Sequence, residues 1–272
     1  MGALEGKVAV VTGGASGIGL ASCRRLASEG ATIVVVDANG EGAQKAASEL
    51  GGVAVEADVG ATGEWTRIVE AGRRLGGIDI AYLNAGVTTG EEDITKLTDE
   101  QYRRILAVNV DAIVFGTRAV VPELVERGGG AVIATSSLAG IVAFAGDPIY
   151  TLTKHAVVGF VRAVAPRLAE HHITINAICP GLVDTPLIDG EIRDSLASAG
   201  FPLIPAEAVA EAVLGCVLGQ DTGQAVVVQL GREAVAYRFG RPPGPRAPGV
   251  EGRIPPEWLA DSGQQAPTTD KN

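Results

Sequence analysis

The chain has 272 residues, of which 46% are hydrophobic and 20% are charged. Such a composition can bury a sizeable core, so it excludes disorder throughout the chain. The formal net charge is −10 and aromatic residues make up 4%, which argues against a nucleic-acid partner, because nucleic acids bind basic surfaces and stack on aromatic rings.

Short β-branched runs alternate with longer segments of helical periodicity along the chain. The predicted strands are residues 8–11, 32–36, 53–56, 78–83, 131–135, 173–178 and 225–229. The predicted helices between them are residues 19–28, 41–50, 63–74, 99–127, 150–170 and 206–218. Most of the strands are continuous apolar runs, which is typical of strands covered on both faces. The sequence therefore predicts an α/β protein with a doubly wound parallel sheet of about seven strands, helices on both faces and ligands at the carboxyl ends of the strands.

The composition changes near Gly240. Half of the prolines lie between this residue and the end of the chain. We therefore expect a single catalytic domain over residues 1–239 and an extended Pro/Gly-rich tail over residues 240–272. The tail is either a floppy terminus or an arm that Trp258 and Leu259 anchor on the domain or on a neighbouring subunit.

A glycine-rich turn joins the first strand to the first helix. Gly13, Ser16, Gly17, Ile18 and Gly19 form this turn. Glycine allows a sharp turn and a close approach to a pyrophosphate, and the helix that follows offers free N–H groups to the phosphates. Because the turn lies between a strand and a helix, it indicates a Rossmann-type nucleotide-binding domain.

An acidic residue ends the second strand. Asp37 follows the turn by about twenty positions, the spacing at which a carboxylate binds the 2′-hydroxyl of the adenine ribose. No Arg or Lys lies in the glycine turn or directly after Asp37, so a 2′-phosphate would meet repulsion there. The sequence predicts NAD as the cofactor and not NADP. The alternative interpretation of Asp37 is an acid that caps a loop.

Three polar residues form a candidate catalytic group. Tyr150 and Lys154 are four residues apart at the start of a predicted helix and therefore share one face. A tyrosine with its ordinary pKa near 10 is a poor base at neutral pH, but an adjacent ammonium favours the phenolate. Ser137 ends the fifth strand thirteen residues before Tyr150. Its hydroxyl can donate to a substrate oxygen, and Ser136 is its rival for this role.

These motifs, in this order, resemble those of the short-chain dehydrogenases/reductases, in the main branch of that family. The resemblance covers about residues 4–231. Asp58 and Val59 match the adenine-contacting pair of the family, and Asn84, Ala85 and Gly86 match its strand-four motif. Asn109 matches the helix asparagine, and Pro180 and Gly181 match the motif after strand six. Leu83 departs from the family, which often has a second asparagine there. The residues after strand seven, 229–233, also replace the family's acidic-Gly-Gly turn.

The resemblance implies a hydride transfer between a nicotinamide and an alcohol or ketone. Tyr150 would be the general acid/base, and Lys154 would lower the pKa of Tyr150 and bind the nicotinamide ribose. Ser137 would bind the substrate oxygen. Asn109 would hold a water that relays protons to Lys154, or it would tie two strands together. Val183 and Thr185 would orient the carboxamide.

The segments expected around the substrate are largely apolar. They are residues 87–89, 141–146 and 186–203, and such linings suit a hydrophobic secondary alcohol or ketone. The helices at 99–127 and 150–170 carry apolar residues on more than one face. The resemblance implies that they form a subunit interface in a homotetramer or, as the alternative, a dimer.

The remaining features predict no metal and no membrane partner. Cys23, Cys179 and Cys216 have no redox or metal spacing, so we expect reduced thiols in a cytoplasmic protein. The histidines form no metal set. No basic secretory segment opens the chain. Charged and polar residues interrupt the apolar stretch 106–125.

Two other functions remain open. An S-adenosylmethionine-dependent methyltransferase also has a glycine turn and an acid after the second strand, but it has no use for Tyr150, Lys154 and Ser137. A non-catalytic NAD-binding sensor or scaffold of the same fold would usually lack the tyrosine or the lysine.

Overall fold

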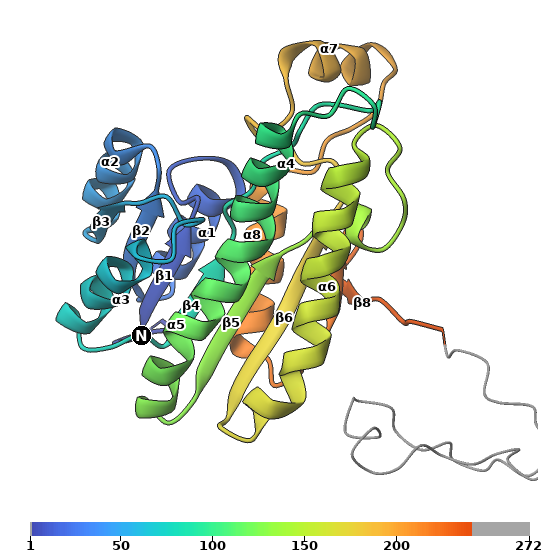
Figure 1. Ribbon diagram of the computed structural model, residues 1–272. Coiled ribbons are helices and arrows are strands. Elements are labelled where there is room, and N and C mark those ends of the chain that lie inside the picture. The colour runs from blue at the N-terminus through green and yellow to red at the C-terminus, as the bar shows by residue number, and fades with distance from the viewer. Residues whose placement is uncertain (1, 241–272) are drawn as a thin grey trace, which may run out of the picture.

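The computed structural model describes residues 2–240. The predicted tail from residue 241 onward, with Trp258 and Leu259, lies outside the described residues. Strands and helices alternate as expected (Figure 1). The strands are β1 (Val8–Thr12), β2 (Thr32–Asp37), β3 (Val53–Glu56), β4 (Ile80–Leu83), β5 (Gly130–Thr135), β6 (Ile173–Pro180), β7 (Ala225–Val228) and β8 (Val235–Ala236). The α-helices are α1 (Gly17–Ser28), α2 (Gly40–Leu50), α3 (Glu64–Arg74), α4 (Asp99–Leu106), α5 (Ala112–Glu126), α6 (Pro148–Ala169), α7 (Gly190–Ser198) and α8 (Ala206–Leu218).

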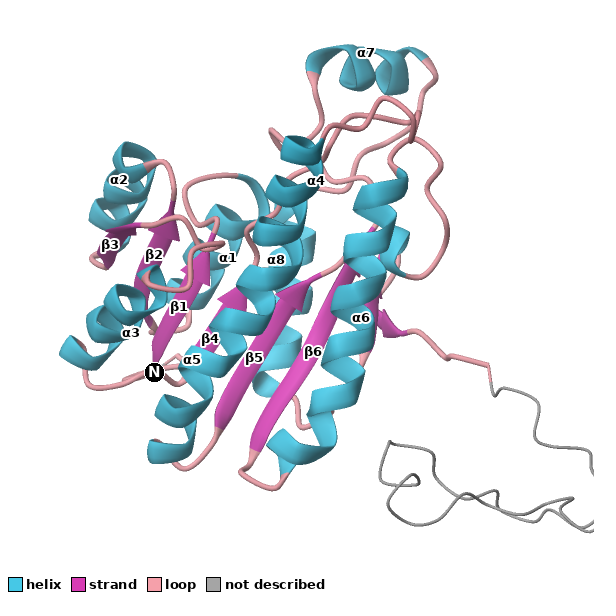
Figure 2. Cartoon of the chain, in the orientation of Figure 1, coloured by secondary structure: helices cyan, strands magenta, loops and turns pink. Residues whose placement is uncertain are grey.

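The strands form one sheet with the order β3-β2-β1-β4-β5-β6-β7-β8, in which β1 to β7 run parallel. Helices α3, α5 and α6 cover one face, and α1, α2 and α8 cover the other (Figure 2). Each layer encloses its own apolar cluster, because the strands present Val, Ile and Leu to both sides. The chain reverses its direction of winding between β1 and β4, which opens a crevice at the carboxyl ends of these strands.

Two elements were not predicted from the sequence. The eighth strand, β8, pairs antiparallel with β7 and is exposed. Helix α7 lies within the stretch 186–203 and buries none of its residues. Neither element has a buried face, so neither carries the hydrophobic periodicity on which prediction depends.

The predicted helix 99–127 consists of α4, a wide π-helical turn (Ala107–Asp111) and α5. Together Asp99–Glu126 is long and apolar enough to cross a membrane by length and composition alone, a test that core helices also pass. Val120 and Leu124 are fully buried against the sheet. The helix therefore contributes to the core of this fold. The π-helical turn contains Asn109, and such turns are frequent at functional sites.

Candidate active site

The glycine turn has the shape that a dinucleotide pyrophosphate requires. Gly13 and Gly17 have positive φ angles of 64° and 51°. A Cβ atom on Gly19 would lie 1.9 Å from the carbonyl oxygen of Gly13, so no side chain fits there. The N-cap Ser16 makes no side-chain hydrogen bond, and no acidic residue lies in the first turn of α1. The helix therefore presents its N–H groups and positive dipole end to a phosphate.

Asn84 fastens this turn to the end of β4. Its Nδ2 donates to the carbonyl oxygens of Thr12 and Gly13, at 3.1 and 3.4 Å. The hydroxyl of Thr12 accepts hydrogen bonds from the backbone N–H groups of Asn84 and Ala85. The strand-four motif thus holds the glycine turn in place, which is a physical reason for an amide side chain at position 84.

The two candidate adenosine-binding carboxylates end neighbouring strands. Asp37 accepts hydrogen bonds from the backbone N–H groups of Ala15 in the turn, at 3.0 Å, and of Asn39, at 2.9 Å. Asp58 lies exposed after β3 and bonds the N–H of Gly60, while the neighbouring Val59 is buried. The structure therefore places a carboxylate beside the turn, where the sequence predicted the ribose.

The three candidate catalytic side chains meet where β5, β6 and α6 converge. Tyr150 lies in the first turn of α6, and Lys154 follows one turn later. The ammonium Nζ lies 5.4 Å from the centroid of the Tyr150 ring. Burial raises the pKa of the Tyr150 phenol to about 12, although its hydrogen bond with Ser137 opposes this rise. Burial lowers the pKa of Lys154 to about 8.

Burial is the largest influence on the pKa of Tyr150, and the lowering of this pKa by Lys154 stays a prediction. Lys154 is 2% exposed, and its Nζ donates to the backbone carbonyl of Thr135 at 2.9 Å. The ammonium is thus held at the end of β5, and burial dominates the environment of the phenol. The hydroxyl of Thr135 also lies 3.0 Å from Oδ1 of Asn84. Thr135 therefore links the lysine to the glycine turn, which sequence patterns did not reveal.

The two candidate serines have different environments. Ser136 is buried, and its hydroxyl donates to the backbone carbonyl of Lys154 at 2.9 Å. Ser137 is half-buried and adjoins the Tyr150 hydroxyl. The geometry therefore favours Ser137 for contact with a substrate oxygen and gives Ser136 a structural role.

Asn109 lies in the π-helical turn and clamps the chain after β4. Its Oδ1 accepts from the N–H of Val87 at 2.8 Å, and its Nδ2 donates to the carbonyl of Val87 at 2.9 Å and to Thr153 Oγ1 at 3.1 Å. A Cβ on Gly86 would lie 3.4 Å from Lys154 Nζ and 3.5 Å from Asn109 Oδ1. Gly86 therefore leaves open the space between the two side chains. The bonds to Val87 and Thr153 join the loop after β4 to helix α6 and do not tie two strands together; the water relay stays a prediction.

The segment after β6 packs against the glycine turn. Pro180 ends β6, and the N–H of Gly181 bonds the carbonyl of Val228 at 3.1 Å. Val183 forms a bridge with Ile204, which brings together both ends of the excursion that carries α7. Thr185 is 9% exposed and packs on the glycine turn, since a Cβ on Gly17 would lie 3.1 Å from its Cγ2. The predicted carboxamide and pyrophosphate residues are thus adjacent.

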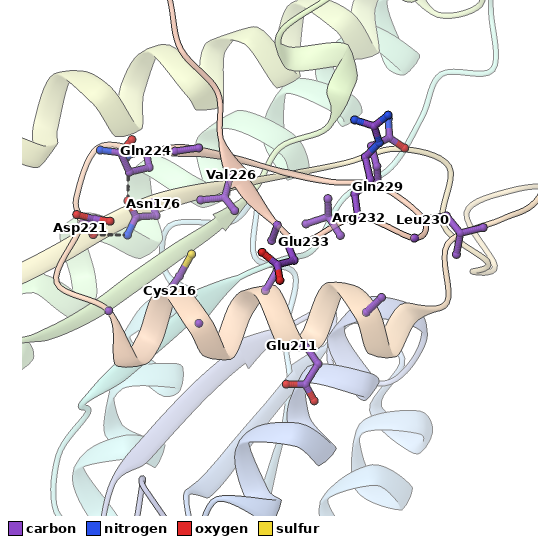
Figure 3. Close-up of a pocket in the computed structure, with 18 of the residues that line it drawn as sticks. Asn176, Glu211, Cys216, Asp221, Gln224, Val226, Gln229, Leu230, Arg232 and Glu233 are labelled. Carbon is purple, nitrogen blue, oxygen red and sulfur yellow. Dashed lines mark hydrogen bonds between the residues drawn. The ribbon is translucent and has the colours of Figure 1, made fainter.

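A separate cavity of about 820 Å³ lies between α8, β7 and the turn 229–234 (Figure 3). Its lining includes Glu211, Cys216, Arg232 and Glu233 but none of the four candidate catalytic residues. Burial raises the pKa of the Cys216 thiol to about 11, so this thiol is protonated at neutral pH. The cavity is therefore distinct from the site around Tyr150.

Taken together, the doubly wound sheet, the glycine turn and the Tyr-Lys-Ser group form a candidate nucleotide-binding site with a candidate acid/base group beside it. The model of the family described as short chain dehydrogenase matches residues 7–195. The chain is 36% identical over 188 residues to cyclohexanol dehydrogenase of Acinetobacter sp. (strain SE19), covering 67% of this chain and 75% of that protein. It is 34% identical over 245 residues to D-beta-hydroxybutyrate dehydrogenase of Rhizobium meliloti (strain 1021), covering 86% and 92% of the two chains.

Among solved structures, the chain resembles the 3-ketoacyl-(acyl-carrier-protein) reductase from Brucella melitensis complexed with NADH. The TM-score is 0.78 and the identity is 32%, over 85% of this chain and 99% of that chain. The chain therefore belongs to the short-chain dehydrogenase/reductase family and is an oxidoreductase of that family.

Proposed function

We propose that the protein is an NAD-dependent dehydrogenase that interconverts a hydrophobic secondary alcohol and its ketone. The observation that carries this proposal is the meeting of Tyr150, Lys154 and Ser137 at the strand ends that also hold the glycine turn. This arrangement places a proton donor and acceptor beside a dinucleotide site. The other functions considered from the sequence do not need these three side chains together.

The glycine turn with the uncapped start of α1, Asp37 and Thr185 fit a dinucleotide. The turn would hold its pyrophosphate, Asp37 its adenine ribose and Thr185 its carboxamide. When bound, the cofactor supplies hydride chemistry. Tyr150 takes the proton from the substrate hydroxyl during oxidation and returns it during reduction. Ser137 donates a hydrogen bond to the same oxygen and stabilises negative charge on it. Lys154 holds a positive charge behind the tyrosine ring, where it opposes the burial that raises the pKa of Tyr150.

The substrate side of the cleft supports an uncharged, apolar substrate. Exposed apolar side chains come from the loop after β5 and from the α7 excursion: Val142, Phe144, Leu187, Ile192 and Phe201. Arg193 bonds the carboxylate of Asp184 and donates to the carbonyl of Thr185 at 2.9 Å. Because its guanidinium is engaged in this way, Arg193 is not free to bind a substrate carboxylate.

The experiment that tests the proposal follows NADH formation by the purified full-length chain. We expect turnover with cyclohexanol and other cyclic or branched secondary alcohols, and at least about tenfold lower kcat/KM with 3-hydroxybutyrate, because burying an unpaired carboxylate is costly. Turnover of 3-hydroxybutyrate alone would contradict the apolar substrate. Cofactor binding without turnover of any alcohol would favour the non-catalytic alternative.

Cofactor choice can be tested at the end of β2. Asp37→Asn removes the negative charge and keeps one of the two oxygens that accept hydrogen bonds from the N–H groups of Ala15 and Asn39. We expect the ratio of kcat/KM with NADP to that with NAD to rise by about 10- to 100-fold, as the loss of a charged hydrogen bond and of a like-charge contact implies. Steady-state kinetics with both cofactors measures this ratio. An unchanged ratio, or a wild-type preference for NADP, would contradict the role of Asp37.

We also propose that the protein forms a homo-oligomer, a tetramer or else a dimer, through the outer face of α5 and α6. Val125 and Leu152 on these helices are exposed, and Phe115 and Phe160 are only partly buried. Apolar side chains left uncovered on these helices support an interface between copies of the chain. The cytoplasmic location expected from the sequence stays a prediction.

Gly159 on α6 provides the test, because a Cβ there would meet no atom within 4 Å. Gly159→Glu therefore fits the monomer and has the better helix propensity. Light scattering should show smaller assemblies than the wild type. Gly215→Glu, at another open glycine on α8, is the control. Dissociation by Gly215→Glu alone would place the interface on α8 and contradict this proposal.

A further inference from the structure

Asp147 is a buried carboxylate that joins the two sides of the cleft. It is 2% exposed and is the N-cap of α6. Its Oδ1 accepts a hydrogen bond from the backbone N–H of Tyr150 at 2.8 Å. Its Oδ2 accepts from the backbone N–H groups of Thr89, at 2.7 Å, and Gly90, at 3.2 Å. One side chain thus binds both the catalytic helix and the loop after β4.

The bonded loop, residues 87–90, runs directly from the cofactor motif that ends in Gly86. Asn109 clamps its first residue, Val87. Asp147 clamps its far end, Thr89 and Gly90. Gln101 of α4 also bonds the loop, through the carbonyl of Thr89 at 3.4 Å. Side chains from different helical elements therefore hold the loop at both of its ends.

The charge of Asp147 is compensated where it lies. Burying a carboxylate is costly unless hydrogen bonds satisfy it, and here three N–H groups do so. The N-terminus of α6 adds the positive end of a helix dipole. A serine at this position would cap the helix alone. The position has therefore been filled by the side chain that can also reach the loop.

We propose that Asp147 is a positioning residue of the reaction, which sets the catalytic helix with one carboxylate oxygen and holds the substrate-side loop 87–90 with the other. This inference rests on the proposed function for its kinetic consequences but not for its geometry. The loop borders the expected substrate cleft, so its release should weaken substrate binding more than it weakens cofactor binding.

The same carboxylate also influences the phenol. The charged and titratable groups around Tyr150 are Lys154 on its own helix, Asp147 at the start of that helix and Cys179 on β6. The negative charge of Asp147 raises the pKa of Tyr150, because it disfavours the phenolate. Removal of this charge should therefore lower the pKa of Tyr150, even though the loop is loosened at the same time.

Asp147→Asn separates these effects from helix capping, because asparagine caps a helix as well as aspartate does. The asparagine side chain has no charge, and its NH₂ donor takes the place of the oxygen that accepts hydrogen bonds from the N–H groups of Thr89 and Gly90. We expect the KM for the alcohol to rise by about tenfold, kcat to stay within about threefold and the KM for NAD to stay unchanged, as loss of a charged hydrogen bond implies. We also expect the acid limb of the kcat/KM profile for oxidation to move to lower pH.

Amide hydrogen exchange provides a readout that needs no activity. In Asp147→Asn, the N–H groups of Thr89 and Gly90 should exchange at least about tenfold faster, while that of Tyr150 stays protected. Asp147→Ala should expose all three. Glu49→Gln on α2 is the control, since it removes the carboxylate of an exposed ion pair with Arg24 on α1 and should change neither the exchange nor the pH profile.

Each result decides a separate question. Unchanged exchange at Thr89 and Gly90 in Asp147→Asn would overturn the inference, whatever the activity of the wild type. Faster exchange over the whole of α6 with an unmoved acid limb would make Asp147 merely structural and would also overturn it. If the wild type oxidises no alcohol but the loop amides respond as expected, the proposed function fails and the positioning of the loop stands.

Discussion

Tyr150→Phe is expected to lower kcat/KM for alcohol oxidation by about 10³-fold, within the range for loss of a positioned general acid/base. The substitution removes the hydroxyl and keeps the ring that lies beside Lys154 Nζ. Packing at the start of α6 is therefore preserved. Because the glycine turn and Asp37 are untouched, the Kd for NAD should stay within about threefold of the wild type. Steady-state kinetics and a binding titration measure the two quantities.

Ser136→Ala and Ser137→Ala complete this experiment. The hydroxyl of Ser136 bonds the backbone of Lys154, whereas that of Ser137 adjoins the phenol. Ser137→Ala should lower kcat, and Ser136→Ala should mainly lower stability. Retention of wild-type activity by Tyr150→Phe would remove Tyr150 from the proton transfer and leave the proposed chemistry without a base.

Lys154→Met is expected to abolish most of the activity and to stabilise the cofactor-free protein. Burial lowers the pKa of Lys154 from 10.5 to about 8, which corresponds to a cost of about 3 kcal/mol at neutral pH for holding the charge in the fold. Methionine avoids this cost but leaves the carbonyl of Thr135 without its donor, a loss of about 1 to 2 kcal/mol. The net gain of about 1 kcal/mol should raise Tm by about 3 °C.

The stability difference between Lys154→Met and the wild type should depend on pH, and this dependence identifies its cause. The pKa of Lys154 is about 8 in the folded protein and 10.5 without the fold. The unfolded state therefore binds more protons between these pH values, and the wild type gains stability as the pH rises. The advantage of Lys154→Met should therefore be largest at pH 7 and shrink by pH 9.5. Thermal unfolding across this range measures it. A constant or growing difference would show that the lysine charge is not what destabilises the wild type.

The sequence by itself determined the architecture and the identity of the candidate site. Continuous Val and Ile runs at the expected spacing predicted β1 to β7, because strands buried on both faces must be apolar throughout. The glycines at 13, 17 and 19 predicted the turn, since the backbone there tolerates no Cβ. These features are local in the chain, so a single sequence reveals them.

The tertiary structure alone decided how the candidate residues are connected. The hydrogen bonds between Lys154 and Thr135, between Asn109 and Val87 and between Asp147 and Thr89 join residues that lie 19, 22 and 58 positions apart. Such pairings leave no periodic trace in the sequence, although Asp147 before a proline does mark a helix start. The pKa of Tyr150 likewise could not be predicted from the sequence. Residue spacing indicated a lysine near the phenol, but burial and the direction in which the ammonium points are set only when distant strands and helices pack together.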